Sequence, residues 1–223
     1  MKNVNLMLGI HIGGAMNRLL FLGTCLCLTA TVAVAAQPGE EFTRPLGFEL
    51  ESITTLGDVQ KKLGPAELTE TGDAGGFLAT VCYVMPDSKT VLSFESGELG
   101  GGGPNPYLEG FSMRVLSGAP PAACFPLAAA VAKKLNLSVG GLYLGMSKKE
   151  FKKVLGKTTV NDEGALEQVF ERREKLSHKE IKQLHSVGVL HPYLGDLDVL
   201  ITVDGKFEGN KLVYLSIWKV KTN

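Results

Sequence analysis

The chain has 223 residues, 44% of them hydrophobic, 21% charged and 7% aromatic, and its 23 basic and 23 acidic side chains balance to a net charge of zero. This balance argues against a uniformly basic nucleic-acid-binding protein and against a strongly acidic, disordered scaffold. The length allows one large domain or two small ones.

Residues 1–36 predict an export signal. They contain no Asp or Glu, they carry Lys2 and Arg18, and a long apolar run ends in the small residues Val34-Ala35-Ala36. A basic start, an apolar core and small residues at the cleavage site are the features that a signal peptidase recognises. We expect cleavage after Ala36. No later segment is as long as a transmembrane helix, so we expect the protein in the periplasm or secreted, with no membrane span in the mature chain.

Cysteine usage agrees with export. Cleavage removes Cys25 and Cys27 and leaves Cys82 and Cys124 as a single pair. Compartments outside the cytoplasm are oxidising and favour disulfide bonds. We therefore predict a bond between Cys82 and Cys124, which closes a loop of about 42 residues and stabilises the fold by roughly 4 kcal/mol in the loop-entropy model.

Three alternatives stay open for the leader. Met16 is a possible start, because residues 16–36 alone form a complete signal. Leu22-Gly23-Thr24-Cys25 loosely resembles a lipobox, so lipidation of Cys25 is the alternative to simple cleavage. An uncleaved leader would act as a membrane anchor.

Two segments of the remaining chain repeat one helical pattern. Residues 55–65 and 147–157 each start with the three-residue spacing of a capping box, and each ends with a glycine that stops a helix. The capping and stop residues are Thr55, Asp58 and Gly64 in the first segment, and Ser147, Glu150 and Gly156 in the second.

Runs of strand-forming residues follow each predicted helix. Asp204-Gly205 has the composition of a hairpin turn. Each half of the chain is therefore predicted to be a short helix followed by a three-stranded antiparallel meander, which gives an α+β protein of two tandem modules. The predicted strands are 77–85, 90–95 and 108–116 in the first half, and 165–172, 197–203 and 211–220 in the second.

The expected organisation is a signal peptide followed by two modules and a linker. A helix is predicted over residues 124–135 and a short strand over 142–144. We expect the glycine-rich loop 97–106 to be mobile and to be a candidate contact element. The domain boundaries are 1–36 for the signal peptide, 37–118 for the first module, 119–141 for the linker with its helix, and 142–223 for the second module.

The segment Gly141–Gly156 reads GLYLGMSKKEFKKVLG. It resembles the segment G-M-(S/T)-x-x-(E/Q)-V-x-x-x-L-G-x-P of the BamE (SmpA/OmlA) family and of the β-lactamase inhibitory proteins. Those families share a module of one helix and an antiparallel meander, which the inhibitors carry in tandem. The resemblance implies a protein that binds another macromolecule, as an inhibitor or as an envelope-assembly factor.

Residues with catalytic or metal-binding chemistry are few. His178, His185 and His191 fall in one insertion, but neighbouring histidines there are seven and six positions apart, which does not suit two ligands on one helix face. We therefore predict no enzymatic activity, no metal and no cofactor. The alternatives are a small periplasmic hydrolase or metal-dependent enzyme that uses residues 178–198, with Asp196 and Asp198, or a purely structural envelope protein.

Charge distribution points to a partner. Residues 37–124 carry 5 basic and 12 acidic side chains, whereas residues 125–223 carry 16 basic and 11 acidic ones. One interpretation is that two oppositely charged modules attract each other. The other is a surface for an anionic protein or envelope component, and few aromatic residues lie among the lysines, which argues against nucleic acid. The predicted binding residues are Lys148, Lys149, Lys152, Lys153 and Lys157, with Tyr214 and Trp218 as aromatic contacts on the last strand.

Overall fold

The fold is described from a computed structural model, which describes residues 37–51, 53–73, 75–86, 89–100, 103–175, 181–182 and 196–222. The chain from Ala36 to Asn223 forms one compact unit. The described residues form nine strands in one sheet, ordered β1-β2-β3-β4-β9-β8-β7-β6, with β5 beside β2. The strands are β1 (Leu68–Thr71), β2 (Leu78–Val84), β3 (Thr90–Ser96), β4 (Gly110–Val115), β5 (Phe125–Pro126), β6 (Thr159–Val160), β7 (Leu166–Lys175), β8 (Asp196–Glu208) and β9 (Lys211–Thr222).

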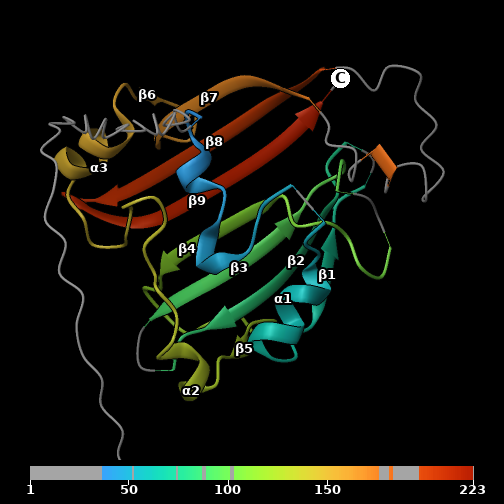
Figure 1. The fold of residues 1–223 in the computed structure, drawn as a ribbon. Helices are drawn as coiled ribbons and strands as arrows, with labels where there is room; N and C mark the ends of the chain where they lie inside the picture. Colours follow the sequence, from blue (N-terminus) through green and yellow to red (C-terminus); the bar gives the residue numbers. More distant parts are fainter. Residues whose placement is uncertain are drawn as a thin grey trace, which may run out of the picture. The chain divides into compact units, whose positions relative to one another are not determined.

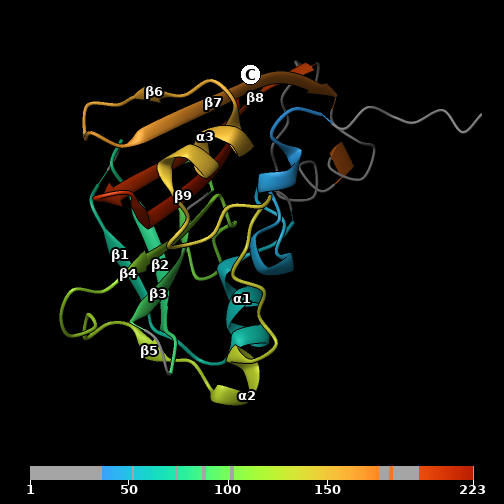
Figure 2. The ribbon, with the colours of Figure 1, turned by 90° about the vertical axis from the view of Figure 1, so that its left-hand side faces the viewer.

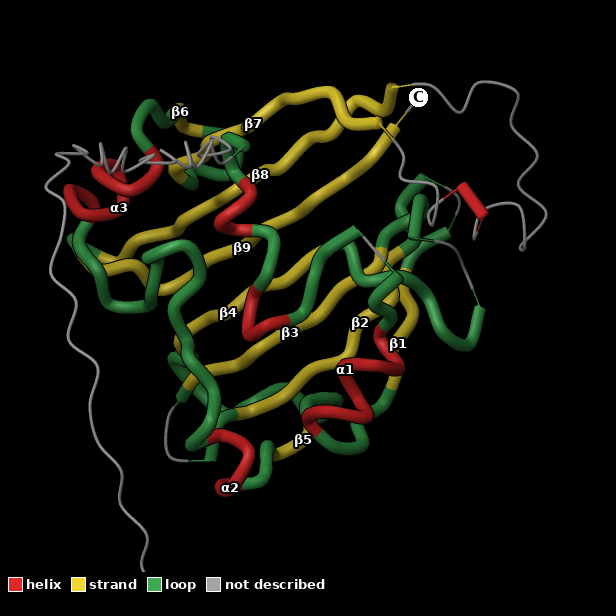
Figure 3. Tube along the Cα trace, in the orientation of Figure 1, coloured by secondary structure: helices red, strands yellow, loops and turns green. Residues whose placement is uncertain are grey.

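Short helices cover one face of this sheet (Figures 1 and 2). Figure 3 shows the helical segments in front of the strands, and we call the opposite face, on which no described helix lies, the open face. The helical segments are η1 (Glu40–Phe42), η2 (Pro45–Gly47), α1 (Leu56–Leu63), α2 (Ala129–Ala132) and α3 (Lys148–Leu155). None of the helices in the described part of the chain has the length and apolar character needed to cross a membrane.

The prediction of two tandem modules, each a helix with its own three-stranded meander, is wrong. Residues 110–114 of β4 pair with residues 214–218 of β9, so strands from both halves of the chain share one sheet. Buried residues of both halves likewise form one core cluster. An isolated meander has an unpaired edge and too small a core, and joining the two edges removes both disadvantages.

Alternation along the strands gives the sheet one apolar and one polar face. On the covered face, Phe94, Phe111, Ile217 and Ile201 occupy neighbouring register positions and are fully buried. Ile217 pairs with Val203 of β8, one alternate residue from Ile201 on the same face. The core therefore lies between this face and the helices.

Residues 37–51 cross the covered face and contribute to the core. Phe42 is fully buried and its ring stacks on Phe170 of β7 with centroids 5.6 Å apart. The Arg172 guanidinium forms an ion pair with Glu40 and donates a hydrogen bond to the Pro38 carbonyl at 3.0 Å. The chain is thus held against the sheet from the second residue after the predicted cleavage site.

The two predicted helix caps are confirmed. Thr55 and Asp58 form a capping box at α1, and Ser147 and Glu150 form one at α3. Each cap satisfies amide groups that the first helical turn leaves without partners. Both helices are short because a glycine follows directly.

Three local predictions are corrected. Asp204-Gly205 lies inside β8, and the turn to β9 is at residues 209–210. The glycine at position 205 makes room for α3, because a Cβ there would be 2.7 Å from the Phe151 ring. The helix predicted over 124–135 is reduced to α2, because residues 125–126 pair with β2. The strand predicted over 142–144 is reduced to one bridge between Val139 and Leu142.

The predicted disulfide between Cys82 and Cys124 is confirmed, with the Cα atoms 4.5 Å apart. Cys82 is in β2 and pairs with Ser93 of β3, which pairs in turn with Ser112 of β4. Residues paired across a sheet lie on the same face, so Cys82 lies on the open face with Ser112. The bond therefore fastens the connection between β4 and β5 to the sheet.

Replacing both cysteines, Cys82→Ala with Cys124→Ala, should lower the free energy of unfolding by about 2–4 kcal/mol, because the bond restricts the unfolded chain across a long loop. Urea unfolding monitored by circular dichroism measures this loss. A reductant should destabilise the native protein and leave the double variant unchanged. Equal stability of the oxidised and reduced native protein would contradict a structural role for the bond.

Candidate functional site

Helix α3 carries four of the five predicted lysines on its solvent side, and Lys157 follows directly after its C-terminal glycine. We call Lys148, Lys149, Lys152, Lys153 and Lys157 the lysine ridge; all five are exposed. The buried side of the helix is anchored by Phe151, whose ring contacts that of Phe207 edge-on at 5.3 Å between centroids. Leu155 is buried on the same side of the helix. The lysines are therefore on the exposed side, and the Lys148 ammonium group lies 5.5 Å from the centre of the Phe207 ring.

The lysine ridge has no neutralising carboxylate among the described residues. The one acidic residue of α3, Glu150, accepts hydrogen bonds from the Ser147 amide at 2.8 Å and hydroxyl at 2.7 Å. These two bonds lower the pKa of Glu150 and keep its charge at the helix N-terminus. The ridge lysines form no ion pair with any described residue. The positive charge of this surface therefore remains available to a partner.

Tyr214 and Trp218 lie on the open face, on the opposite side of the sheet from α3. Both are on β9, at alternate positions with the buried Ser216, and both are partly buried. The structure therefore separates the seven predicted binding residues into two surfaces, the lysine ridge and an aromatic pair.

The open face places hydroxyl and carboxyl groups beside these aromatic rings. Trp218 pairs with Gly110 of β4, where an added Cβ would be 2.7 Å from the indole. Two residues further along β4, the Ser112 hydroxyl donates a hydrogen bond of 3.0 Å to the Glu95 carboxyl group of β3. Burial raises the pKa values of Glu95 and Tyr214. Sequence reasoning missed Glu95 and Ser112, although both alternate with apolar residues along their strands.

Asp204 is the most perturbed carboxyl group on this face. Burial raises its pKa to about 6, and the Glu167 carboxylate on the neighbouring strand adds to the shift. The Asn161 side-chain amide donates a hydrogen bond to Asp204 Oδ1 at 3.0 Å, which partly offsets the shift. Perturbed carboxyl groups are common at functional sites and are also common in structural networks. The other groups that act on Asp204 are the Glu163 carboxylate and the Lys206 ammonium group, which form an ion pair with each other at 2.6 Å.

The described ends of the glycine-rich loop 97–106 are held by hydrogen bonds. Glu109 is almost fully buried and its Oε2 accepts from the Gly97 amide at 2.5 Å. Asn105 Oδ1 accepts from the Gly57 amide at the start of α1, at 2.9 Å. These bonds fix the two ends of the loop to the sheet and to α1.

The alternative enzymatic site cannot be assembled from the described residues. His178, His185 and His191 lie outside them. Asp198 is exposed on β8 and forms an ion pair with Arg173 at 3.1 Å. Within the described ranges, no group of three or more His, Cys, Asp or Glu side chains has the arrangement of a metal site.

Gly110→Val should displace the indole of Trp218, because the space above position 110 is already filled by that ring. Trp218 is the single tryptophan of the chain, so its fluorescence reports directly on the open face. We expect a red-shifted emission and a loss of about 1–3 kcal/mol in unfolding free energy, as for other overpacked sites. Ser112→Ala on the same face is the control and should leave the emission unchanged.

Asp204→Asn should stabilise the protein at neutral pH and have little effect at acidic pH. The folded-state pKa of about 6 exceeds the ordinary 3.8, so the native state keeps its proton longer than the unfolded state. Because of Asp204, the unfolding free energy of the native protein therefore falls as the pH rises from about 4 to 6, by on the order of 1–3 kcal/mol in total. Urea unfolding at pH 4 and pH 7.5 tests this.

The control for that measurement is Asp198→Asn, an exposed position on the same strand that pairs with Arg173. The effect of Asp198→Asn on the free energy of unfolding should be the same at pH 4 and at pH 7.5. An equal effect of Asp204→Asn at both pH values would contradict the assigned titration.

Comparisons of the chain with protein-family models, with curated proteins and with solved structures gave no match.

Proposed function

We propose that the protein is an exported, non-enzymatic binding protein that holds an anionic macromolecular partner through the lysine ridge. The observation that carries the proposal is a helix of eight residues, followed closely by Lys157, whose exposed lysines have no acidic partner among the described residues. The partner would be an acidic protein or an anionic envelope component.

The ridge reduces the intrinsic stability of its own helix. Lys148 and Lys152 are four residues apart, as are Lys149 and Lys153, so like charges are neighbours along the helix surface. Each such pair destabilises a helix by about 0.2–0.5 kcal/mol. An anionic partner would relieve this repulsion, and the exposed positive field would accelerate its association at low salt.

Export is supported by the start of the compact unit and by the disulfide. The compact unit begins at Ala36, the residue before the predicted cleavage position. Glu40 and Phe42 are already packed against β7 a few residues later. A signal peptide that ends at Ala36 would leave the packed segment intact, and the Cys82–Cys124 bond suits an oxidising compartment.

The fourfold variant Lys148→Glu, Lys149→Glu, Lys152→Glu, Lys153→Glu should lose at least tenfold in affinity for the anionic partner, because attraction becomes repulsion. The purified exported protein and the variant are compared for capture of partners from periplasmic extract and for retention on a sulfated polysaccharide matrix over a salt gradient. The native protein should elute at higher salt.

A matched variant separates the ridge from general charge effects. Lys61→Glu, Lys89→Glu, Lys133→Glu reverses three exposed lysines of other elements and should retain the partner. Circular dichroism confirms folding of both variants. Capture of the same partner with unchanged affinity by the ridge variant would refute the proposal.

A further inference from the structure

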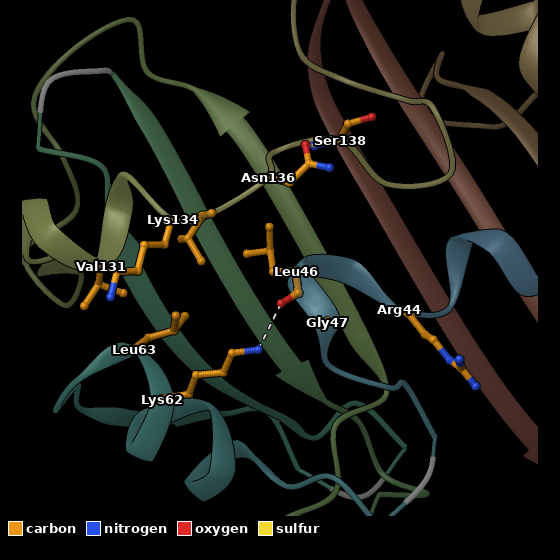
Figure 4. Close-up of a pocket in the computed structure, with 10 residues that line it drawn as sticks. Arg44, Leu46, Gly47, Lys62, Leu63, Val131, Lys134, Asn136 and Ser138 are labelled. Carbon is orange, nitrogen blue, oxygen red and sulfur yellow. Dashed lines mark hydrogen bonds between the residues drawn. The ribbon is translucent and has the colours of Figure 1, made fainter. Parts of the chain in front are cut away.

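A pocket of about 440 Å³ lies between α1, α2 and the segment around η2 (Figure 4). This volume is within the range of 300–1,000 Å³ that is typical of small-molecule sites. Three cations surround the pocket. In Figure 4, Lys62 extends from α1 into the middle, with Arg44 on one side and Lys134 on the other.

Lys62 carries a positive charge that neutral groups hold in place. Its Nζ donates a hydrogen bond to the Leu46 carbonyl at 3.1 Å and lies 4.3 Å from the centre of the Phe48 ring. Among the described residues no carboxylate forms an ion pair with it, whereas the adjacent Lys61 pairs with Asp58 at 2.9 Å. The pocket therefore contains an exposed ammonium group that contacts a carbonyl and an aromatic ring and that no described carboxylate neutralises.

The backbone at Leu46 is in an unfavourable conformation where it meets Lys62. Leu46 has a φ of 53°, in the left-handed region that residues with a side chain rarely adopt. Such a conformation costs on the order of 1–3 kcal/mol and often occurs at ligand sites. Here it directs the Leu46 carbonyl at the ammonium group and orients Lys62 across the pocket.

The remaining wall is mixed, because Asn136 and Ser138 contribute polar groups beside the aliphatic side chains. Leu63 of α1 is almost fully buried, and Val131 of α2 and Leu135 contribute partly buried aliphatic side chains. Arg44 is paired weakly with Glu49, at 3.6 Å between two exposed groups. The site thus combines the Lys62 ammonium group and two further basic residues at its edge with a wall of aliphatic and polar side chains.

We propose that this pocket binds a small amphiphilic anion, a carboxylate or phosphate head group attached to an acyl chain. The head group replaces the Leu46 carbonyl as the partner of Lys62, and the chain lies against Leu63, Val131 and Leu135. A neutral lipid would leave the ammonium group uncompensated, and a fully hydrophilic anion would leave the aliphatic wall exposed. This site is separate from the lysine ridge and does not depend on its function.

Isothermal titration of the purified exported protein with octanoate, octyl phosphate and octanamide tests the proposal. Octanoate and octyl phosphate should bind at least tenfold more tightly than the neutral octanamide, and acetate should not bind measurably. Tighter binding of octanoate identifies a free fatty acid as the ligand source, and tighter binding of octyl phosphate identifies a lipid phosphate; either supports the proposal.

Two variants locate the site. Lys62→Met keeps the aliphatic stem but removes the charge, and should lower the affinity for octanoate and for octyl phosphate at least tenfold. Val131→Trp should fill the pocket and lower the affinity for octanoate, octyl phosphate and octanamide. Lys61→Met is the matched control, one residue away and paired with Asp58, and should change affinity less than twofold.

Thermal unfolding confirms that each variant is folded before titration. The proposal is overturned if neither anion binds at millimolar concentration, if octanamide binds as tightly as octanoate, or if Lys62→Met binds like the native protein.

Discussion

The pairing of β4 with β9 determines the rest of the structure. Five residue pairs between positions 110–114 and 214–218 join residues that are 100 to 108 positions apart in sequence. Their alternation sends Phe111 and Ile217 to the core and Ser112 and Ser216 to the open face. One register thus merges two cores and sets which side of the sheet the helices cover. A shift of one residue would exchange the two faces, which would expose the core residues to water.

This one-sided covering separates the candidate surfaces. The lysine ridge and the pocket both belong to the helical side, because α3, α1 and α2 lie there (Figure 2). Trp218 and Tyr214 face away from them, on a sheet surface rich in hydroxyl groups. A partner that contacts the lysine ridge therefore leaves the aromatic pair uncovered, and the two predicted sets of binding residues cannot serve one flat interface.

Local features of the fold could be predicted from the sequence, whereas long-range features could not. The capping pairs at Thr55 and Ser147 could be predicted because cap and partner are three residues apart. The disulfide could be predicted because only two cysteines lie outside the predicted signal peptide. The β4–β9 register depends on how two distant edges fit, and no local pattern encodes it. Gly205 shows the same limit, because its role is to make room for Phe151 of α3. The lysine ridge could be predicted because its charges are adjacent in sequence. The pocket could not be predicted, because the sequence does not distinguish Lys61 from Lys62. Only the fold places Lys61 beside Asp58 and Lys62 beside the Leu46 carbonyl.

The opposite charges of the two halves have a different role from the one that modular docking would give them. Backbone pairing between β4 and β9 and a shared core already hold the halves together, and Arg172 with Glu40 adds an ion pair between them. The ridge lysines take no part in this contact. Since the exposed charges are not needed to join the halves, salt should screen the association with an anionic partner much more than it changes the stability of the fold. The charge asymmetry of the chain is therefore not needed to join the halves, and under the proposed function it attracts the anionic partner.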